Sequence, residues 1–241
     1  MSEEIQTFEQ VDKVERKKVF FSFLFPGLFI AIISLIKLIE IELKLDFGTF
    51  GILPRTLSGL KGILFSPLIH GDWNHLFNNS IPLFILGGIL FYFYKAVAFR
   101  VIILSYILSG LYTWISARHS FHIGASGLVY ALFGFLFISG FLRKHIPLIA
   151  LSFLVAFLYG SLIWGILPWK REISWEGHFW GLLVGVILAF FYQKKGPQKK
   201  EFIWEDEEEE GDEVVEILKN EKEPRIIYHF RPKDSTNETD D

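Results

Sequence analysis

Long apolar stretches alternate with short polar segments along this chain, and their lengths predict membrane-spanning helices. A helix needs about 20 mostly apolar residues to cross a bilayer. Six stretches approach this length, although the fourth and the sixth are short and carry a polar residue near one end. They cover residues 19–41, 75–94, 97–116, 126–142, 146–165 and 177–193. The pattern predicts an all-α membrane protein, a bundle of six transmembrane helices.

The distribution of positive charge predicts how these helices are oriented. Twelve Lys and Arg residues fall in the segments on the N-terminal side of the membrane, and six fall in the segments on the other side. Cytosolic segments carry the excess of positive charge, so we expect both termini in the cytosol, and a bacterial plasma membrane suits such a chain. The opposite orientation remains an alternative, because the outer segments also carry Lys and Arg residues.

Composition separates a membrane body from an acidic tail. The sequence is 51% hydrophobic and 17% aromatic, which is more apolar than soluble domains tolerate. Residues 201–241 carry a net charge of −11 against +8 for the remainder. We expect a cytosolic segment over 1–18, a membrane domain over 19–195, and a disordered acidic tail over 196–241. A plain solvated tail is favoured, and docking to a cytosolic partner stays open.

Two further features limit the kind of function. The connection over residues 42–74 is too rich in apolar residues for a simple solvated loop, so we expect it to lie at the membrane interface. The sequence contains no cysteine, which excludes disulfides and thiolate catalysis. We expect the lipid bilayer as the surroundings, and neither a cofactor, a metal ion nor a nucleic-acid partner.

A serine opens the fourth apolar stretch between two glycines. In "GASG", Gly124 and Gly127 flank Ser126 and leave room for another backbone to approach closely. Ser126, Tyr130 and Gly134 lie four residues apart and therefore on one helical face. Taken alone, this stretch is more typical of a packing seam of small residues than of a reactive site.

A histidine opens the sixth stretch in a similar way. His178 precedes Gly181 and Gly185 on nearly the same face, and small residues at this spacing let a neighbouring helix come close. An ionisable group within a span is a functional candidate, whereas a histidine bonded to a loop is the plain alternative. If the two seams face each other, Ser126 can reach His178, and imidazole can take the proton that makes a hydroxyl nucleophilic. Tyr130 would then stack on the imidazole.

The polar stretch "HGDWNHLFNN" offers hydrogen-bond donors for such a site. His75 and Asn79 lie four residues apart on one helical face and can both donate toward a developing oxyanion. His70 lies just outside the helix, and we expect it to support them. A water-filled polar pocket without chemistry remains an alternative. A metal site formed by His70, His75 and Asp72 is disfavoured, because no further ligand recurs at metal spacing.

Together these motifs resemble the rhomboid family of intramembrane serine proteases. "HGDWNHLFNN", "GASG" and "GHFWGLLVG" occur in family order, and the resemblance covers about residues 60–195. It implies a six-helix core whose active site opens toward the outer side, with Ser126 as nucleophile and His178 as base. It also implies an oxyanion hole formed by His75, Asn79 and the Ser126 backbone N–H. Tyr130 would support the base.

The first connection departs from the family pattern, and the tail lies outside it. Many relatives carry a Trp-Arg pair in this connection, and none occurs over residues 42–69, although Arg55 is present. How the connection is anchored is therefore left open. The acidic tail beyond about residue 196 has no counterpart in the resemblance.

We therefore predict an intramembrane endopeptidase that cleaves single-pass membrane proteins within or beside their transmembrane helix. One alternative is an inactive relative that binds helices without cutting them. Another is a small transporter, which would predict internal repeats. A third is a scaffold whose tail binds a cytosolic partner.

Overall fold

The apolar stretches of the sequence form helices in the computed structural model, which describes residues 2–169 and 173–198, with side chains from Asp12 onward. Most of the predicted acidic tail lies outside the described residues. The helical elements are α1 (Ser2–Glu42), η1 (Gly48–Phe50), η2 (Ser58–Lys61), α2 (Gly62–Phe65), η3 (Ser66–Leu68), α3 (Trp73–Phe93), α4 (Ala98–Ser116), α5 (Ser126–Arg143), α6 (Ile146–Tyr159), η4 (Gly160–Ile166) and α7 (Trp175–Phe191). Within the described ranges the fold is all-helical.

Five of these helices are long and apolar enough to cross a membrane. They cover Asp12–Glu42, Trp73–Phe93, Ala98–Ser116, Ser126–Arg143 and Ile146–Ile166. The sixth predicted span, α7, is an apolar helix of 17 residues, which corresponds to about 25 Å at 1.5 Å per residue. The predicted first span is part of a longer helix, because the polar residues before it continue α1 back to Ser2.

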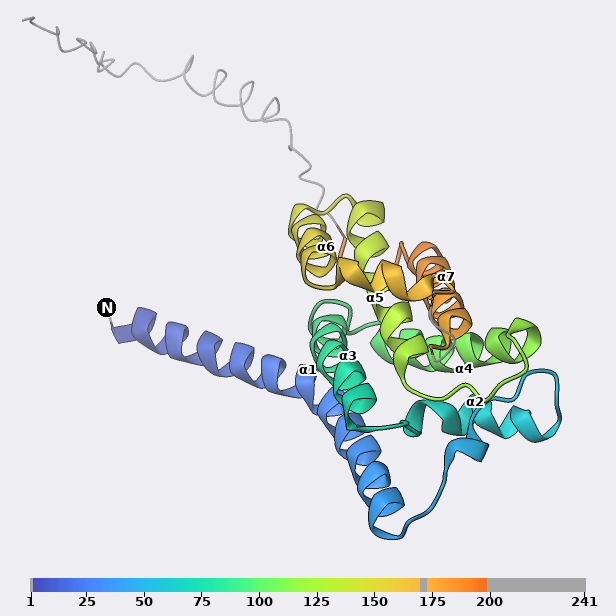
Figure 1. Cartoon of the computed structure of the whole chain (residues 1–241). Coiled ribbons are helices and arrows are strands. Elements are labelled where there is room, and N and C mark those ends of the chain that lie inside the picture. The colour runs from blue at the N-terminus through green and yellow to red at the C-terminus, as the bar shows by residue number, and fades with distance from the viewer. Residues whose placement is uncertain (1, 170–172, 199–241) are drawn as a thin grey trace, which may run out of the picture. The chain divides into compact units, whose positions relative to one another are not determined.

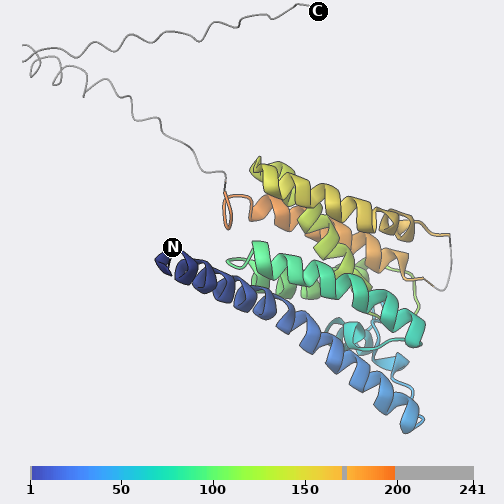
Figure 2. The same ribbon diagram turned by 90° about the vertical axis from the view of Figure 1, so that its left-hand side faces the viewer.

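Helix α5 occupies the centre of the bundle (Figures 1 and 2). It packs most extensively against α7 and also contacts α6, α3 and α4, whereas α1 packs against α3. Figure 2 shows α1 and α3 side by side, with α6 and α7 on the far side of α5. Because α3, α5 and α7 all have polar residues at their N-terminal ends, the packing around α5 decides whether these residues meet.

The contact between α5 and α7 depends on small residues. A Cβ atom built on Gly181 would lie 2.1 Å from the carbonyl oxygen of Gly127, and one built on Gly185 would lie 2.0 Å from that of Ala131. No side chain fits at such distances, so the two helices approach backbone to backbone. This close approach brings the first turns of α5 and α7 together.

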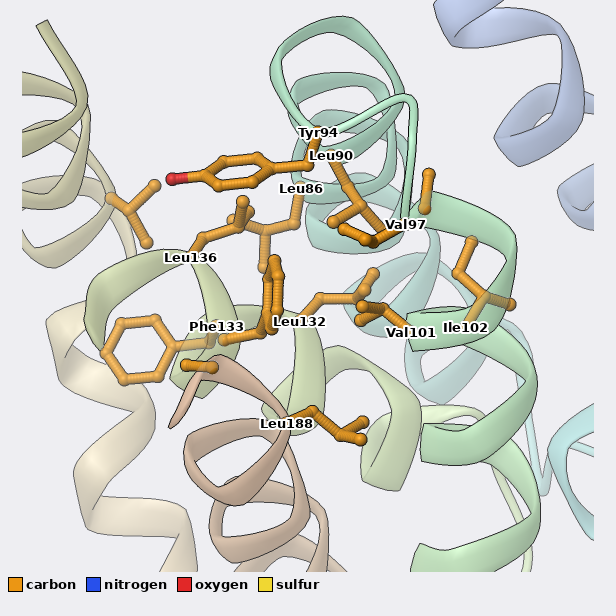
Figure 3. Close-up of a cluster of buried hydrophobic side chains, with 14 of the residues drawn as sticks. Leu86, Leu90, Tyr94, Val97, Val101, Ile102, Leu132, Phe133, Leu136 and Leu188 are labelled. Carbon is orange, nitrogen blue, oxygen red and sulfur yellow. The ribbon is translucent and has the colours of Figure 1, made fainter. Parts of the chain in front are cut away.

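A cluster of buried apolar side chains stabilises the opposite end of the bundle. Leu86 and Leu90 of α3 belong to the same buried cluster as Leu132 and Leu136 of α5 (Figure 3). Each of the four is fully buried, and because lipid tails are as apolar as leucine, these side chains join the helices through close van der Waals packing. The cluster holds α3 and α5 in a common register and so fixes the heights of their polar ends.

The first connection lies against the start of the α4–α5 loop. The Arg55 guanidinium donates to the carbonyl of Ala117 at 2.8 Å, and the Trp114 indole donates to the carbonyl of Thr56 at 2.9 Å. Ile52 and His122 exchange two backbone hydrogen bonds of 2.9 Å. The backbone N–H of Arg55 also donates to the carbonyl of Trp114 at 3.0 Å, in the last turn of α4. These contacts anchor the connection to the protein.

Candidate active site

The first turns of α5 and α7 bring a hydroxyl and an imidazole together. The Oγ of Ser126 lies 2.8 Å from the Nε2 of His178, although the two residues are 52 positions apart in the sequence. Ser126 is the first residue of α5, and His178 lies in the first turn of α7. The close backbone approach of α5 and α7 at Gly181 and Gly185 allows this distance.

A backbone carbonyl orients the imidazole. The Nδ1 of His178 lies 2.9 Å from the carbonyl oxygen of Gly165, at the end of η4. A carbonyl only accepts hydrogen bonds, so Nδ1 carries the proton and Nε2 presents a lone pair. The Ser126 hydroxyl therefore donates to Nε2. This is the tautomer that a general base requires, and a carbonyl does here what a carboxylate does in a triad.

The ring of Tyr130 covers one face of the imidazole. Its ring stacks on that of His178 with centroids 4.3 Å apart and planes 9° apart. Its hydroxyl donates to the carbonyl of Leu162 at 2.7 Å. The two carbonyls of η4 therefore hold the imidazole of His178 and the ring that stacks on it, from a segment in which the sequence shows no polar motif.

The imidazole of His75 and the side-chain amide of Asn79 converge beside Ser126 and His178. A Cβ atom built on Gly124 would lie 2.5 Å from the Nε2 of His75 and 3.4 Å from the Nδ2 of Asn79. Asn79 is buried, and its Nδ2 has no hydrogen-bond partner among the described residues. An unpaired buried donor is costly, so the Nδ2 of Asn79 is available to bond a group that enters the cavity it lines.

Gly124 makes room for these donors through its backbone conformation. Its φ is +105°, which residues with a side chain rarely adopt. Its N–H donates to the carbonyl of Ser66 at 2.8 Å, which ties the loop before α5 to η3. A side chain at this position would be both strained and in contact with His75, so glycine is required on two grounds.

His70 lies behind the site rather than in it. It is almost fully buried, and its Nε2 accepts a long hydrogen bond of 3.4 Å from the N–H of Ala125. Its ring packs edge-on against that of His75 at 5.1 Å. Burial lowers the pKa of His70 to about 4, so the ring is neutral at physiological pH. His70 supports the loop of Ser126 and the ring of His75.

Asp72 has a structural task that the sequence reasoning missed. Its Oδ1 accepts the N–H of His75 at 2.8 Å and so caps the N-terminus of α3. Among the residues that the structure describes, no three His, Cys, Asp or Glu side chains gather as metal ligands do. An aspartate immediately before a helical pattern is the usual signal for a cap.

The loop before α7 is held in place by the loop before α5. The Arg118 guanidinium donates to the carbonyl of Ile173 at 2.7 Å and lies 3.5 Å from the Glu176 carboxylate. The Nδ1 of His122 lies 2.6 Å from the Oγ of Ser174, while its Nε2 lies 3.1 Å from the carbonyl of Arg118. Nε2 is therefore the donor, and Ser174 donates to Nδ1. Burial lowers the pKa of His122, which favours this neutral form.

A cavity of about 720 Å³ connects these groups. Its lining combines polar side chains with apolar ones such as Phe121 and Leu162, and it includes His75, Asn79, Ser126, Tyr130 and His178. Gly127, Gly181 and Gly185 lie in the seam beneath it. The cavity is therefore lined by a hydroxyl paired with an imidazole and by the side chains of His75 and Asn79.

Known proteins with similar sequences identify the family. Residues 58–195 match the family model described as the Rhomboid domain. Uncharacterised proteins of Mycobacterium tuberculosis and Mycobacterium bovis are each 34% identical over 182 residues, which cover 71% of this chain and 75% of theirs. One of Mycobacterium leprae is 32% identical over 182 residues, with 71% of each chain covered.

The apolar helices and the domain match define an integral membrane protein with a helical rhomboid domain. The chain belongs to the rhomboid family. Members of this family are typically intramembrane proteases, as the resemblance of the motifs implies.

Proposed function

We propose that this protein is an intramembrane serine endopeptidase that hydrolyses peptide bonds in transmembrane-helix substrates. The observation that carries the proposal is the 2.8 Å contact between Ser126 Oγ and His178 Nε2, at a cavity that His75 and Asn79 also line. The hydroxyl donor, the lone pair of the base and the oxyanion donors are the groups that acyl transfer needs.

The proposed reaction has two stages. Ser126 Oγ attacks the scissile carbonyl carbon while its proton passes to His178 Nε2. The tetrahedral intermediate collapses, the C–N bond breaks, and His178 returns the proton to the leaving amine. A water molecule then attacks the acyl carbon while His178 takes one of its protons. The bond from this carbon to Ser126 Oγ breaks, and His178 returns the proton to Oγ, which frees a product with a new carboxyl terminus.

The oxyanion of each tetrahedral intermediate would bind three donors. These are His75 Nε2–H, Asn79 Nδ2–H and the backbone N–H of Ser126. Losing one such donor costs roughly 100- to 1000-fold in rate. Because both side-chain donors come from α3, the packing of α3 against α5 sets their distance from the nucleophile.

The proposed membrane arrangement follows the sequence prediction. All six helices would span a bacterial plasma membrane with both termini in the cytosol, and α7 would cross where the bilayer is locally thin. Water would enter from the side where α5 and α7 begin. A substrate from a single-pass protein must unwind locally before cleavage, because a helical peptide bond is shielded by its own hydrogen bonds.

The proposal is tested by cleavage in proteoliposomes. The full chain is reconstituted with a single-pass substrate, and the new product terminus is identified by mass spectrometry. Ser126→Ala and His178→Ala should each lower the rate by at least about 1000-fold. The exposed Ser58→Ala and His119→Ala serve as matched controls and should cleave normally. Undiminished cleavage by either active-site variant would refute the proposal.

A fluorophosphonate probe separates a protease from a non-cleaving membrane binding protein. Such a probe labels a serine only when a base activates it. We expect labelling of the wild type at Ser126 and none of the His178→Ala variant. An unlabelled wild type would favour the binding protein instead.

A further inference from the structure

A buried ion pair lies on α1, on the helix face that packs toward Gly71, just before α3. The Nζ of Lys37 lies 2.8 Å from Oε2 of Glu40, one turn further along the helix, and the two side chains are only 9% and 11% exposed. Charges within an apolar span are costly and mark functional positions by default. Both residues fall within the apolar stretch 19–41, in which they form no recognisable motif.

Each member of the pair also holds a backbone group outside α1. Lys37 Nζ donates to the carbonyl of Gly71 at 2.9 Å, and Glu40 Oε1 accepts the N–H of Phe47 at 2.9 Å. Gly71 directly precedes the residue that caps α3. The pair therefore joins α1 to both ends of the first connection.

Gly71 connects Lys37 to the imidazole of His75. The N–H of Gly71 points at Nδ1 of His75 in a long hydrogen bond of 3.5 Å. Since this nitrogen accepts, the proton of the neutral ring is on Nε2. Nε2 is the atom beside Gly124 at the reaction site. The position of the Gly71 backbone thus selects both the tautomer and the direction of His75.

We propose that the Lys37–Glu40 pair positions the oxyanion donor His75 through the backbone of Gly71. Lys37 is a positioning residue, since its ammonium contacts the Gly71 carbonyl rather than a reacting atom. Glu40 neutralises the ammonium and fixes its direction. The inference rests on the proposed function, because it assigns the pair a task in that reaction.

Stability alone explains the pair poorly. A buried ion pair gains little net free energy over well-packed apolar residues of the same volume, because desolvation offsets the attraction. Breaking such a pair by removing one partner leaves an uncompensated charge. A test must therefore separate the effect on His75 from a general loss of folding.

The test compares Lys37→Met with Lys44→Met, a control at an exposed lysine near the end of α1. We measure kcat and KM in proteoliposomes, the rate of fluorophosphonate labelling and the melting temperature. Because a 1 Å misplacement can cost about 100-fold, we expect Lys37→Met to lower kcat and labelling by about 10- to 100-fold. KM should stay within about twofold, and Lys37→Arg, which keeps a donor, should recover most of the rate.

Combination with His75→Ala gives the decisive readout. If Lys37 acts through His75, the Lys37→Met/His75→Ala double variant should label less than about twofold more slowly than His75→Ala alone. The inference would be overturned if Lys37→Met lowered the labelling rate by the same factor in the wild type and in His75→Ala. It would also be overturned if Lys37→Met had the same kcat and labelling rate as Lys44→Met. Where Lys37→Met does not fold, Lys37→Met/Glu40→Gln removes both charges and is judged by the same two comparisons.

The failure of this inference is distinguishable from the failure of the proposed function. If the wild type neither cleaves nor labels at Ser126, the proposed function is wrong. If cleavage depends on Ser126 and His178 but Lys37 has no effect through His75, only the inference about the ion pair is wrong.

Discussion

A single methyl group at Gly165 should disturb the imidazole of His178, the proposed base, through non-bonded contacts alone. A Cβ atom built on Gly165 would lie 1.9 Å from the Tyr130 hydroxyl oxygen and 3.2 Å from His178 Nδ1. The φ of Gly165 is not in the left-handed region, so alanine brings a steric change and no backbone strain. The phenol or η4 must therefore retreat by about 1.5 Å to restore an ordinary van der Waals contact of about 3.5 Å.

Either movement weakens the support of His178. If the phenol retreats, the 2.7 Å bond from Tyr130 to the Leu162 carbonyl lengthens and the stacked ring shifts. If η4 retreats, the Gly165 carbonyl leaves Nδ1. Overpacking costs about 1–3 kcal/mol, and a 1 Å shift of a reacting group costs about 100-fold in rate. We expect kcat/KM to fall by about 10- to 100-fold.

Gly160 provides a matched control in the same segment. A Cβ atom on Gly160 would meet no heavy atom within 4 Å. Both glycine-to-alanine changes reduce the freedom of the unfolded chain equally, so the comparison isolates the contact with Tyr130. The assay measures kcat/KM in proteoliposomes, with the melting temperature recorded for each variant. Equal rates for Gly165→Ala and Gly160→Ala would refute the argument that η4 orients the base.

Three further predictions concern the support of the site. Tyr130→Phe keeps the stacked ring and loses one hydrogen bond of about 1 kcal/mol, so kcat/KM should fall about 5-fold; an unchanged rate would show that the bond is dispensable. Gly185→Ala should destabilise the fold by about 1–3 kcal/mol in thermal unfolding, whereas Gly27→Ala, which meets only an ordinary contact at 3.7 Å, should not. Because the pKa of His70 falls from 6.5 to about 4 on burial, the unfolded state binds an extra proton between these values. The melting temperature should therefore fall as the pH drops from 6.5 to 4, less steeply for His70→Gln.

The sequence by itself determined the helices and their polar ends. Apolar stretches long enough to span a bilayer can satisfy their backbone groups there only as helices, so the all-helical fold was predictable. The four-residue spacing in Ser126 and Tyr130, and in His75 and Asn79, determines which helix faces carry polar groups. The structure then places Ser126 and His178 in contact, as the two seams suggested, while their catalytic roles stay predictions.

The tertiary structure alone decided which groups complete the site. The carbonyl of Gly165 approaches His178 from 13 positions away, and Lys37 reaches Gly71 from 34 positions away. A backbone carbonyl has no sequence signature, and a lysine in an apolar stretch does not name its partner. Sequence periodicity specifies the face of one helix, but only the packing of several helices specifies which atoms meet.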